Sequence, residues 1–163
     1  IPMKPNIFIF LAFPMLLFFS CNSDDDSVAE SDRDQALLGQ WEYEAIDSNT
    51  AVDINGDGTV NVDLFNTNEI RQCLKDNLTF FSSRGAEEKG AFSINENGLS
   101  CGEVPAFQNV EDDSYELIDN RIIRFDNRND WIIVEFSQNR LVVDQEDFLD
   151  DQDVVITYTF KRS

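Results

Sequence analysis

The residues best suited to chemistry are the oxygen-bearing side chains of segment 53–63, which reads DINGDGTVNVD. Asp53, Asn55 and Asp57 occupy alternate positions, and Gly58 follows in the sixth place. Alternating oxygen ligands can converge on one hard cation, and a glycine at the sixth place permits the sharp turn that convergence requires. The spacing therefore predicts a structural calcium ion, with the candidate ligands Asp53, Asn55, Asp57, Thr59, Asn61 and Asp63.

This segment also has a simpler interpretation. It resembles EF-hand and dockerin loops at Asp53, Asn55 and Asp57, but the twelfth place is Leu64 and the acid stands one place earlier, at Asp63. Asp and Asn side chains also close short turns by accepting hydrogen bonds from nearby backbone N–H groups. A surface loop of such turns explains the pattern without a metal, so both interpretations stay open.

Composition limits the other chemistries. The chain has 163 residues, with 12 Lys+Arg, 32 Asp+Glu and no His, which gives a formal charge of −20. Without histidine there is no Ser-His-Asp or Cys-His catalytic set and no His-ligated metal. The negative charge opposes binding to nucleic acid. A glycosidase needs two carboxylates about 5–10 Å apart. Among 32 acidic residues such pairs arise by chance, so they do not indicate a hydrolase. We therefore expect no catalytic residues, and a carbohydrate-active hydrolase is the least favoured alternative.

The N-terminal segment has the features of a secretory signal. Ile7 to Phe19 is an uninterrupted apolar run of 13 residues, preceded by Lys4 and followed by Ser20 and Cys21. At 1.5 Å per residue the run covers about 20 Å, which is too short to cross a membrane as a helix. We assign residues 1–20 to a signal peptide. The sequence Phe-Phe-Ser-Cys at its end resembles a bacterial lipobox, which implies that Cys21 is lipidated and becomes the new N-terminus.

Residues 21–35 carry six acids and almost no apolar side chains. Such a segment cannot bury enough surface to fold, so we expect an extended, self-repelling tether. Ser23 and the three acids after it resemble the surface-export signal of lipoproteins in Bacteroidota. The resemblance implies a protein anchored to the outer membrane by its lipid and exposed at the cell surface, with a periplasm-facing orientation as the alternative.

Cys73 and Cys101 remain once Cys21 is assigned to lipid. An exported protein meets an oxidising compartment, so these two thiols are expected to pair. The bridge would enclose 27 residues, and a loop of that length corresponds to about 3–4 kcal/mol of stabilisation in the chain-entropy model. Two buried free thiols are the alternative.

These residues must be positioned by a chain whose dominant period is two from residue 36 onward. Short β-rich runs alternate with turn-rich spacers, which is typical of hairpins. One helix is expected, over residues 63–75. About eight strands joined to their sequence neighbours can close into an all-β, antiparallel up-and-down barrel, and an open sandwich is the alternative. The predicted strands cover residues 41–45, 78–81, 91–94, 114–118, 121–125, 131–136, 140–144 and 154–160.

The first strand carries a family resemblance. Leu38-Gly39-Gln40-Trp41 resembles the Gly-x-Trp start of lipocalin-type barrels, and residues 36–163 are similar to small lipocalin-like lipoproteins of Bacteroidota. The resemblance implies an eight-stranded barrel around a cavity, formed by a domain spanning 36–163. It also implies that a basic residue near the end of the chain, Lys161 or Arg162, packs over Trp41.

We therefore expect a monomeric, non-enzymatic lipoprotein that binds a small apolar or amphipathic ligand in the mouth of its barrel. The alternative is a structural or accessory surface protein whose barrel is packed solid and whose loops contact protein or glycan partners. Large inward aromatic side chains would favour the packed barrel, and small inward side chains would favour a cavity.

Overall fold

The computed structural model describes residues 27–85, 89–102 and 109–163. The predicted signal peptide and Cys21 lie outside these ranges. The described residues contain the helices η1 (Glu30–Asp32), α1 (Arg33–Leu37) and α2 (Gln72–Lys75), together with nine strands. None of these helices is long and apolar enough to cross a membrane. The strands are β1 (Gly39–Val52), β2 (Asn61–Asp63), β3 (Leu78–Ser82), β4 (Gly90–Asn95), β5 (Asn109–Ile118), β6 (Ile122–Phe125), β7 (Trp131–Phe136), β8 (Arg140–Leu149) and β9 (Gln152–Arg162).

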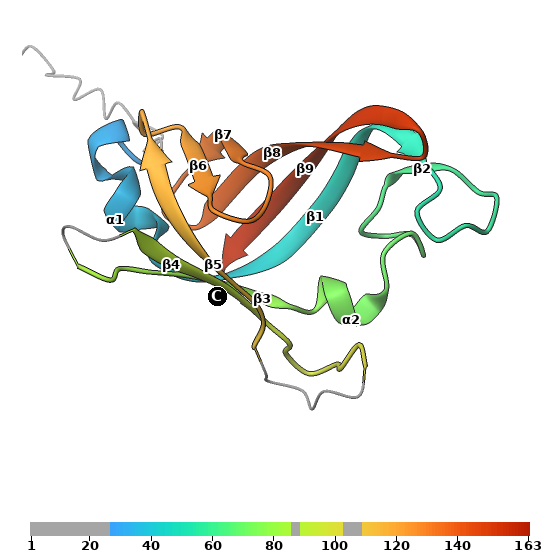
Figure 1. Cartoon of the computed structure of the whole chain (residues 1–163), viewed down its shortest axis with the longest axis horizontal. Helices are drawn as coiled ribbons and strands as arrows, with labels where there is room; N and C mark the ends of the chain where they lie inside the picture. Colours follow the sequence, from blue (N-terminus) through green and yellow to red (C-terminus); the bar gives the residue numbers. More distant parts are fainter. Residues whose placement is uncertain (1–26, 86–88, 103–108) are drawn as a thin grey trace, which may run out of the picture.

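Eight of these strands form a closed antiparallel barrel. From β3 to β9 each strand pairs with the next along the chain, β3 also pairs with β1, and β9 returns to pair with β1 from Trp41 opposite Arg162 to Ser48 opposite Ile156. β2 is an additional short strand on β1 (Figure 1). Closure removes the open edges that an eight-stranded sheet would otherwise expose. The predicted all-β, up-and-down barrel is confirmed.

The helix predicted over 63–75 is wrong for most of its length. Asp63 ends β2, and only Gln72–Lys75 is α-helical. The buried Lys75 ammonium donates hydrogen bonds to the carbonyls of Phe65 and Thr67, at 2.7 and 2.9 Å. These carbonyls would serve the next turn of a continuous helix. Tertiary hydrogen bonds therefore hold the segment in an irregular conformation that local sequence did not indicate.

The expected extended tether also differs from the structure over its described part. Residues 27–35 fold onto the barrel, because Val28 N donates to Phe136 O at 2.9 Å and η1 and α1 follow. Arg33 Nη1 donates to Asn120 O at 2.9 Å, and Leu37 is fully buried. The burial of Leu37 and these long-range hydrogen bonds supply the tertiary stabilisation that an acidic segment lacks by itself.

One end of the barrel is closed by α1 and the Gly-x-Trp motif. Trp41 Nε1 donates to Leu37 O at 2.9 Å, and the Arg162 guanidinium lies 4.3 Å from the centre of the Trp41 ring. Arg162 is thus the basic residue expected over the tryptophan, whereas Lys161 pairs with Glu42 at 3.2 Å. A Cβ at Gly39 would lie 2.9 Å from Arg162 Nη1, so glycine there leaves room for the arginine.

Aromatic side chains fill the half of the barrel next to α1. Trp131 on β7 lies 6.3 Å from Phe81 on β3 and 5.7 Å from Phe92 on β4, measured between ring centroids. It also lies 5.4 Å from Phe160 on β9. Rings from opposite walls therefore touch across the interior, and most of their contacts are edge-to-face or tilted, which are favourable geometries. This half is a packed core.

The predicted strands 140–144 and 154–160 leave the acidic residues 145–153 as their connection, but β8 continues through this stretch to Leu149. β8 and β9 pair without interruption up to Leu149 opposite Gln152. Asp150 and Asp151 connect them with φ of 51° and 59°, the left-handed pair that a two-residue hairpin turn needs. The long hairpin is held by a second core cluster of Ile46, Val52, Leu64, Val154 and Ile156.

The predicted disulfide between Cys73 and Cys101 is confirmed, with a Cα–Cα distance of 5.2 Å. It ties α2, just before β3, to the loop that follows β4. Because β3 and β4 are neighbours in the sheet, the bridge lies at the end of the barrel opposite α1.

We predict that Gly90→Ala lowers the free energy of unfolding by about 1–3 kcal/mol, the usual cost of overpacking. A Cβ at Gly90 would lie 2.3 Å from Tyr115 Cε1, and the two residues are direct cross-strand partners. Chemical denaturation measures the change. Gly102→Ala is the matched control, because a Cβ there has open space and should change stability by less than about 0.5 kcal/mol. Equal stability of the two variants would contradict the close packing of Gly90 against Tyr115.

Candidate functional site

Beyond the aromatic core, on the side away from α1, the inward side chains of the barrel include polar groups. Tyr43 and Tyr158 face inward, with their ring centroids 6.0 Å apart, and both remain partly exposed. Trp131 and Phe160, next to them toward α1, are fully buried. The two tyrosines therefore keep some solvent contact, and they also pack against the second core cluster, in which Ile46 and Ile156 are buried. We call this region the open half, defined by the inward residues Tyr43, Asn77, Thr79, Glu96, Glu111, Arg128 and Tyr158.

Arg128 is the cation of the open half. It lies in the turn between β6 and β7, and its guanidinium carbon is 4.9, 5.0 and 4.8 Å from the ring centres of Phe92, Phe125 and Trp131. Its Nη1 donates to Glu111 Oε1 at 3.1 Å. The arginine therefore covers the aromatic core through cation–π contacts while it pairs with Glu111.

Two buried acceptors of the open half have no donor. Asn77 and Glu96 are 4% and 3% exposed, and among the described residues neither Asn77 Oδ1 nor Glu96 Oε2 has a hydrogen-bond partner. The other carboxylate oxygen, Glu96 Oε1, accepts from Cys101 N at 2.8 Å. Leaving a buried polar atom unpaired costs about 1–3 kcal/mol, so such atoms are expected to meet water or a ligand.

The pKa values of the tyrosines reflect the low polarity of the barrel interior. Burial raises the pKa of Tyr43, and the nearby Arg128 charge opposes this increase. Burial likewise raises the pKa of Tyr158, with a further increase from Tyr43. At the opposite end, burial and then the Asp34 charge raise the pKa of Tyr115 to about 12. All three phenols of the chain therefore stay protonated at neutral pH and can donate hydrogen bonds.

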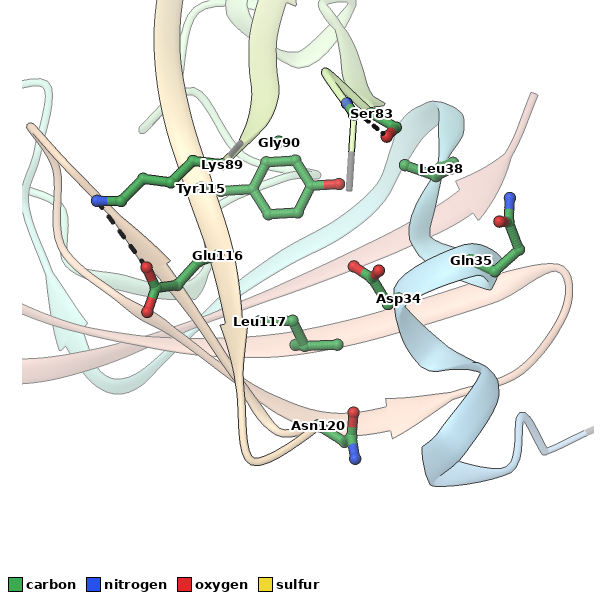
Figure 2. Close-up of a pocket in the computed structure, with 11 residues that line it drawn as sticks. Asp34, Gln35, Leu38, Ser83, Lys89, Gly90, Tyr115, Glu116, Leu117 and Asn120 are labelled. Carbon is green, nitrogen blue, oxygen red and sulfur yellow. Dashed lines mark hydrogen bonds and ion pairs between the residues drawn. The ribbon is translucent and has the colours of Figure 1, made fainter. Parts of the chain in front are cut away.

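A separate hollow lies at the closed end (Figure 2). It has a volume of about 560 Å³ and lies between α1 and β5, with Asp34, Tyr115 and Leu117 in its wall. Lys89, its one lining cation among the described residues, pairs with Glu116 at 4.0 Å and with Asp126. No unpaired buried polar atom found in the described residues belongs to its lining. The hollow therefore has room for a ligand but lacks the unmet polar groups of the open half.

In the predicted calcium segment, the structure brings only part of the ligand set together. Asp53 accepts hydrogen bonds from the backbone N–H groups of Gly56 and Gly58, both at 2.7 Å, and Asp57 accepts from Thr59 N. Hydrogen bonds from Thr59 and Asn55 lower the pKa of Asp57. These hydrogen bonds close the short turns that explain the segment without a metal ion.

The other predicted ligands face different partners. The Asp63 carboxylate accepts from Asn66, and Asn61 Nδ2 donates to Glu69 Oε1 at 2.7 Å. Within the described ranges, no group of three or more Asp, Glu, Cys or His side chains could hold a metal ion. Calcium binding stays a prediction of the sequence. If calcium binds, calorimetry should record heat of binding that the Asp57→Ala variant abolishes. The absence of heat at millimolar calcium would contradict the prediction.

Sequence reasoning missed Asn77, Glu96 and Arg128. The predicted strands began at residue 78 and ended at residue 94, so Asn77 and Glu96 counted as loop residues. Extending the alternation by one step from Thr79 and Ile94 would have placed both side chains inside the barrel. Arg128 lies in a turn, where no periodicity indicates which way a side chain points.

Comparison with known proteins gives structural similarity alone. No protein-family model matches the sequence, and no curated protein matches it either. The siderocalin Ex-FABP is 12% identical over 78% of this chain and 71% of its own, with a TM-score of 0.46. A bovine odorant-binding protein in complex with a selenium-containing odorant is 19% identical over 80% and 72%, with a TM-score of 0.37. The fluorescent protein UnaG is 13% identical over 79% and 97%, with a TM-score of 0.36.

We predict that the tyrosines make the protein less stable at alkaline pH. The ordinary tyrosine pKa is about 10, and the folded-state pKa of Tyr115 is about 12. Below the unfolded value both states keep the proton, so stability does not change with pH. Above it the unfolded chain loses its phenolic protons first, and the free energy of unfolding falls as pH rises toward the folded values.

Tyrosinate absorbance and thermal unfolding, recorded across this alkaline range, measure the effect. The folded protein should show no tyrosine that titrates normally, and Tyr115→Phe should make the loss of stability less steep. A full set of normal phenol titrations before unfolding would contradict the buried environment.

Proposed function

We propose that the protein is a non-enzymatic binder of a small amphipathic molecule, which it holds in the open half of the barrel. The observation that carries the proposal is the contrast between the two halves of one interior. Rings fill the half next to α1, whereas Tyr43 and Tyr158 are inward and partly accessible. Asn77 and Glu96 add buried acceptors with no donor among the described residues.

The aromatic core sets the depth and polarity of this site. A ligand can descend as far as Trp131 and Phe160, whose rings lie against Tyr158 at 5.7 and 6.3 Å. The apolar part of the ligand would rest on the two tyrosine rings, and its polar part would meet the buried oxygens or the edge of Arg128. An eight-stranded barrel can hold one such small molecule where side chains do not fill its interior.

The filled half also favours a second candidate function. Large inward aromatics are what we expected of a packed barrel that presents its loops to protein or glycan partners. In that case water alone occupies the open half, and the protein binds no small amphipathic molecule there.

The proposed location follows from the N-terminal segment. We propose that lipidated Cys21 anchors the barrel to the outer membrane and that Ser23 with its three following acids directs it to the cell surface. Val28 N already donates to Phe136 O on β7, so only a few residues would separate the lipid from the folded domain.

Ligand binding can be measured with the two tryptophans of the chain, which lie at different depths. Trp41 belongs to the closed end beside Leu37, and Trp131 lies next to Tyr158 below the open half. We predict that small aromatic amphiphiles cause a saturable change in the emission of Trp131 in the Trp41→Phe variant. The matched Trp131→Phe variant, which keeps only Trp41, should not respond. A panel without any saturable response would contradict ligand binding and support the packed barrel.

Lipid anchoring gives a separate prediction. Expressed in a bacterium that processes lipoproteins, the full chain should incorporate an alkynyl fatty acid, and Cys21→Ala should lose the label and leave the membrane fraction. Replacing Asp24, Asp25 and Asp26 with Ala should keep the label but remove the protein from protease attack on intact cells. Labelling of Cys21→Ala, or unchanged surface cleavage of the triple variant, would contradict the corresponding assignment.

A further inference from the structure

We propose that the open half recognises a cationic amino group through Glu96 and Asn77, so that the ligand is an amphipathic amine. The inference rests on the proposed function and specifies the chemical class of its ligand. It is carried by two buried oxygens, next to the paired ends of β3 and β4, that have no donor among the described residues.

Asn77 and Glu96 extend the β3–β4 ladder by one position. Leu78 lies opposite Asn95, and Thr79 lies opposite Ile94. Thr79 and Ile94 are buried on the inner face, so the next positions on that face are Asn77 and Glu96. The same register continued across β1 and β3, where Trp41 lies opposite Thr79, places Asn77 beside Tyr43. The two oxygens therefore lie near the wall formed by the tyrosine rings.

Two cations have partners of their own, although Arg128 Nε has none among the described residues. Lys75 donates to the carbonyls of Phe65 and Thr67, and Arg128 binds Glu111. In the described part of the chain no ion pair involves Glu96. A buried carboxylate without a cation is expensive, and a partner that supplies both positive charge and N–H donors offsets that cost.

An organic ammonium fits these groups better than a metal ion does. Calcium takes six to eight oxygen ligands, and the described residues offer no acidic cluster of the size a metal needs. An ammonium group needs about three acceptors, which Glu96 Oε2 and Asn77 Oδ1 can share with a tyrosine hydroxyl. The faces of the Tyr43 and Tyr158 rings add cation–π attraction. The net charge of −20 also attracts cations to the protein.

The test compares phenethylamine, phenethyl alcohol and phenylpropionate, which share a ring and differ in their polar end. Binding to the full chain is followed by calorimetry and by Trp131 emission. We expect the amine to bind at least about tenfold more tightly than the alcohol, which corresponds to about 1.4 kcal/mol, and the carboxylate to bind most weakly. Glu96→Gln should remove the preference for the amine over the alcohol.

Glu96→Gln keeps a carbonyl oxygen that can accept from Cys101 N, so the loop should stay folded. Asp112→Asn is the matched control, because it removes the same charge from an exposed carboxylate on β5 and should preserve the preference. Equal affinity for amine and alcohol, or an amine preference that survives Glu96→Gln, would overturn the inference while leaving ligand binding intact. No binding of any of the three would overturn the proposed function itself.

Discussion

The pairing of β9 with β1 is the constraint on which the rest of the structure depends. It turns a row of hairpins into a closed surface, and an eight-stranded barrel encloses a space that side chains can nearly fill. Every inward position then competes for one small volume. Trp41, at the start of this seam, is fixed by Leu37 on one side and by Arg162 on the other. The seam and the closed end are therefore stabilised by the same few residues.

The enclosed volume is divided along the barrel axis. Next to α1 it holds interlocking aromatic rings, which supply hydrophobic stabilisation without leaving polar atoms unpaired. Further along it holds Asn77, Glu96 and Arg128, each with a buried polar atom that lacks a partner among the described residues. Such atoms lower stability, and proteins tend to keep them where function requires them. The packed half therefore supplies stability that the polar half does not.

The fold could be predicted from the sequence because β-rich runs are joined by short turns, as Trp131–Phe136 and the predicted part of β8, residues 140–144, illustrate. The disulfide followed from the small number of cysteines. Features set by tertiary contacts could not be predicted. Residues 63–75 carry a helical apolar pattern, yet Lys75 holds two carbonyls of that segment. Asn77 and Glu96 lie one and two residues beyond the predicted strands, so they counted as loop residues although the alternation, if extended, places them on the inner face.

The disulfide connects stability to the candidate site. In the chain-entropy model its effect arises in the unfolded state, wherever the bridge lies. Here the bridge lies beside the mouth, and the backbone N–H of Cys101 holds one oxygen of Glu96. With Oε1 fixed in this way, Oε2 is the oxygen left for an incoming group. Because the cross-link joins α2 to the loop after β4, it restrains the rim where Asn77 and Glu96 lie. A covalent restraint at that rim would preorganise the two acceptors for the proposed ligand and lower the entropic cost of binding it.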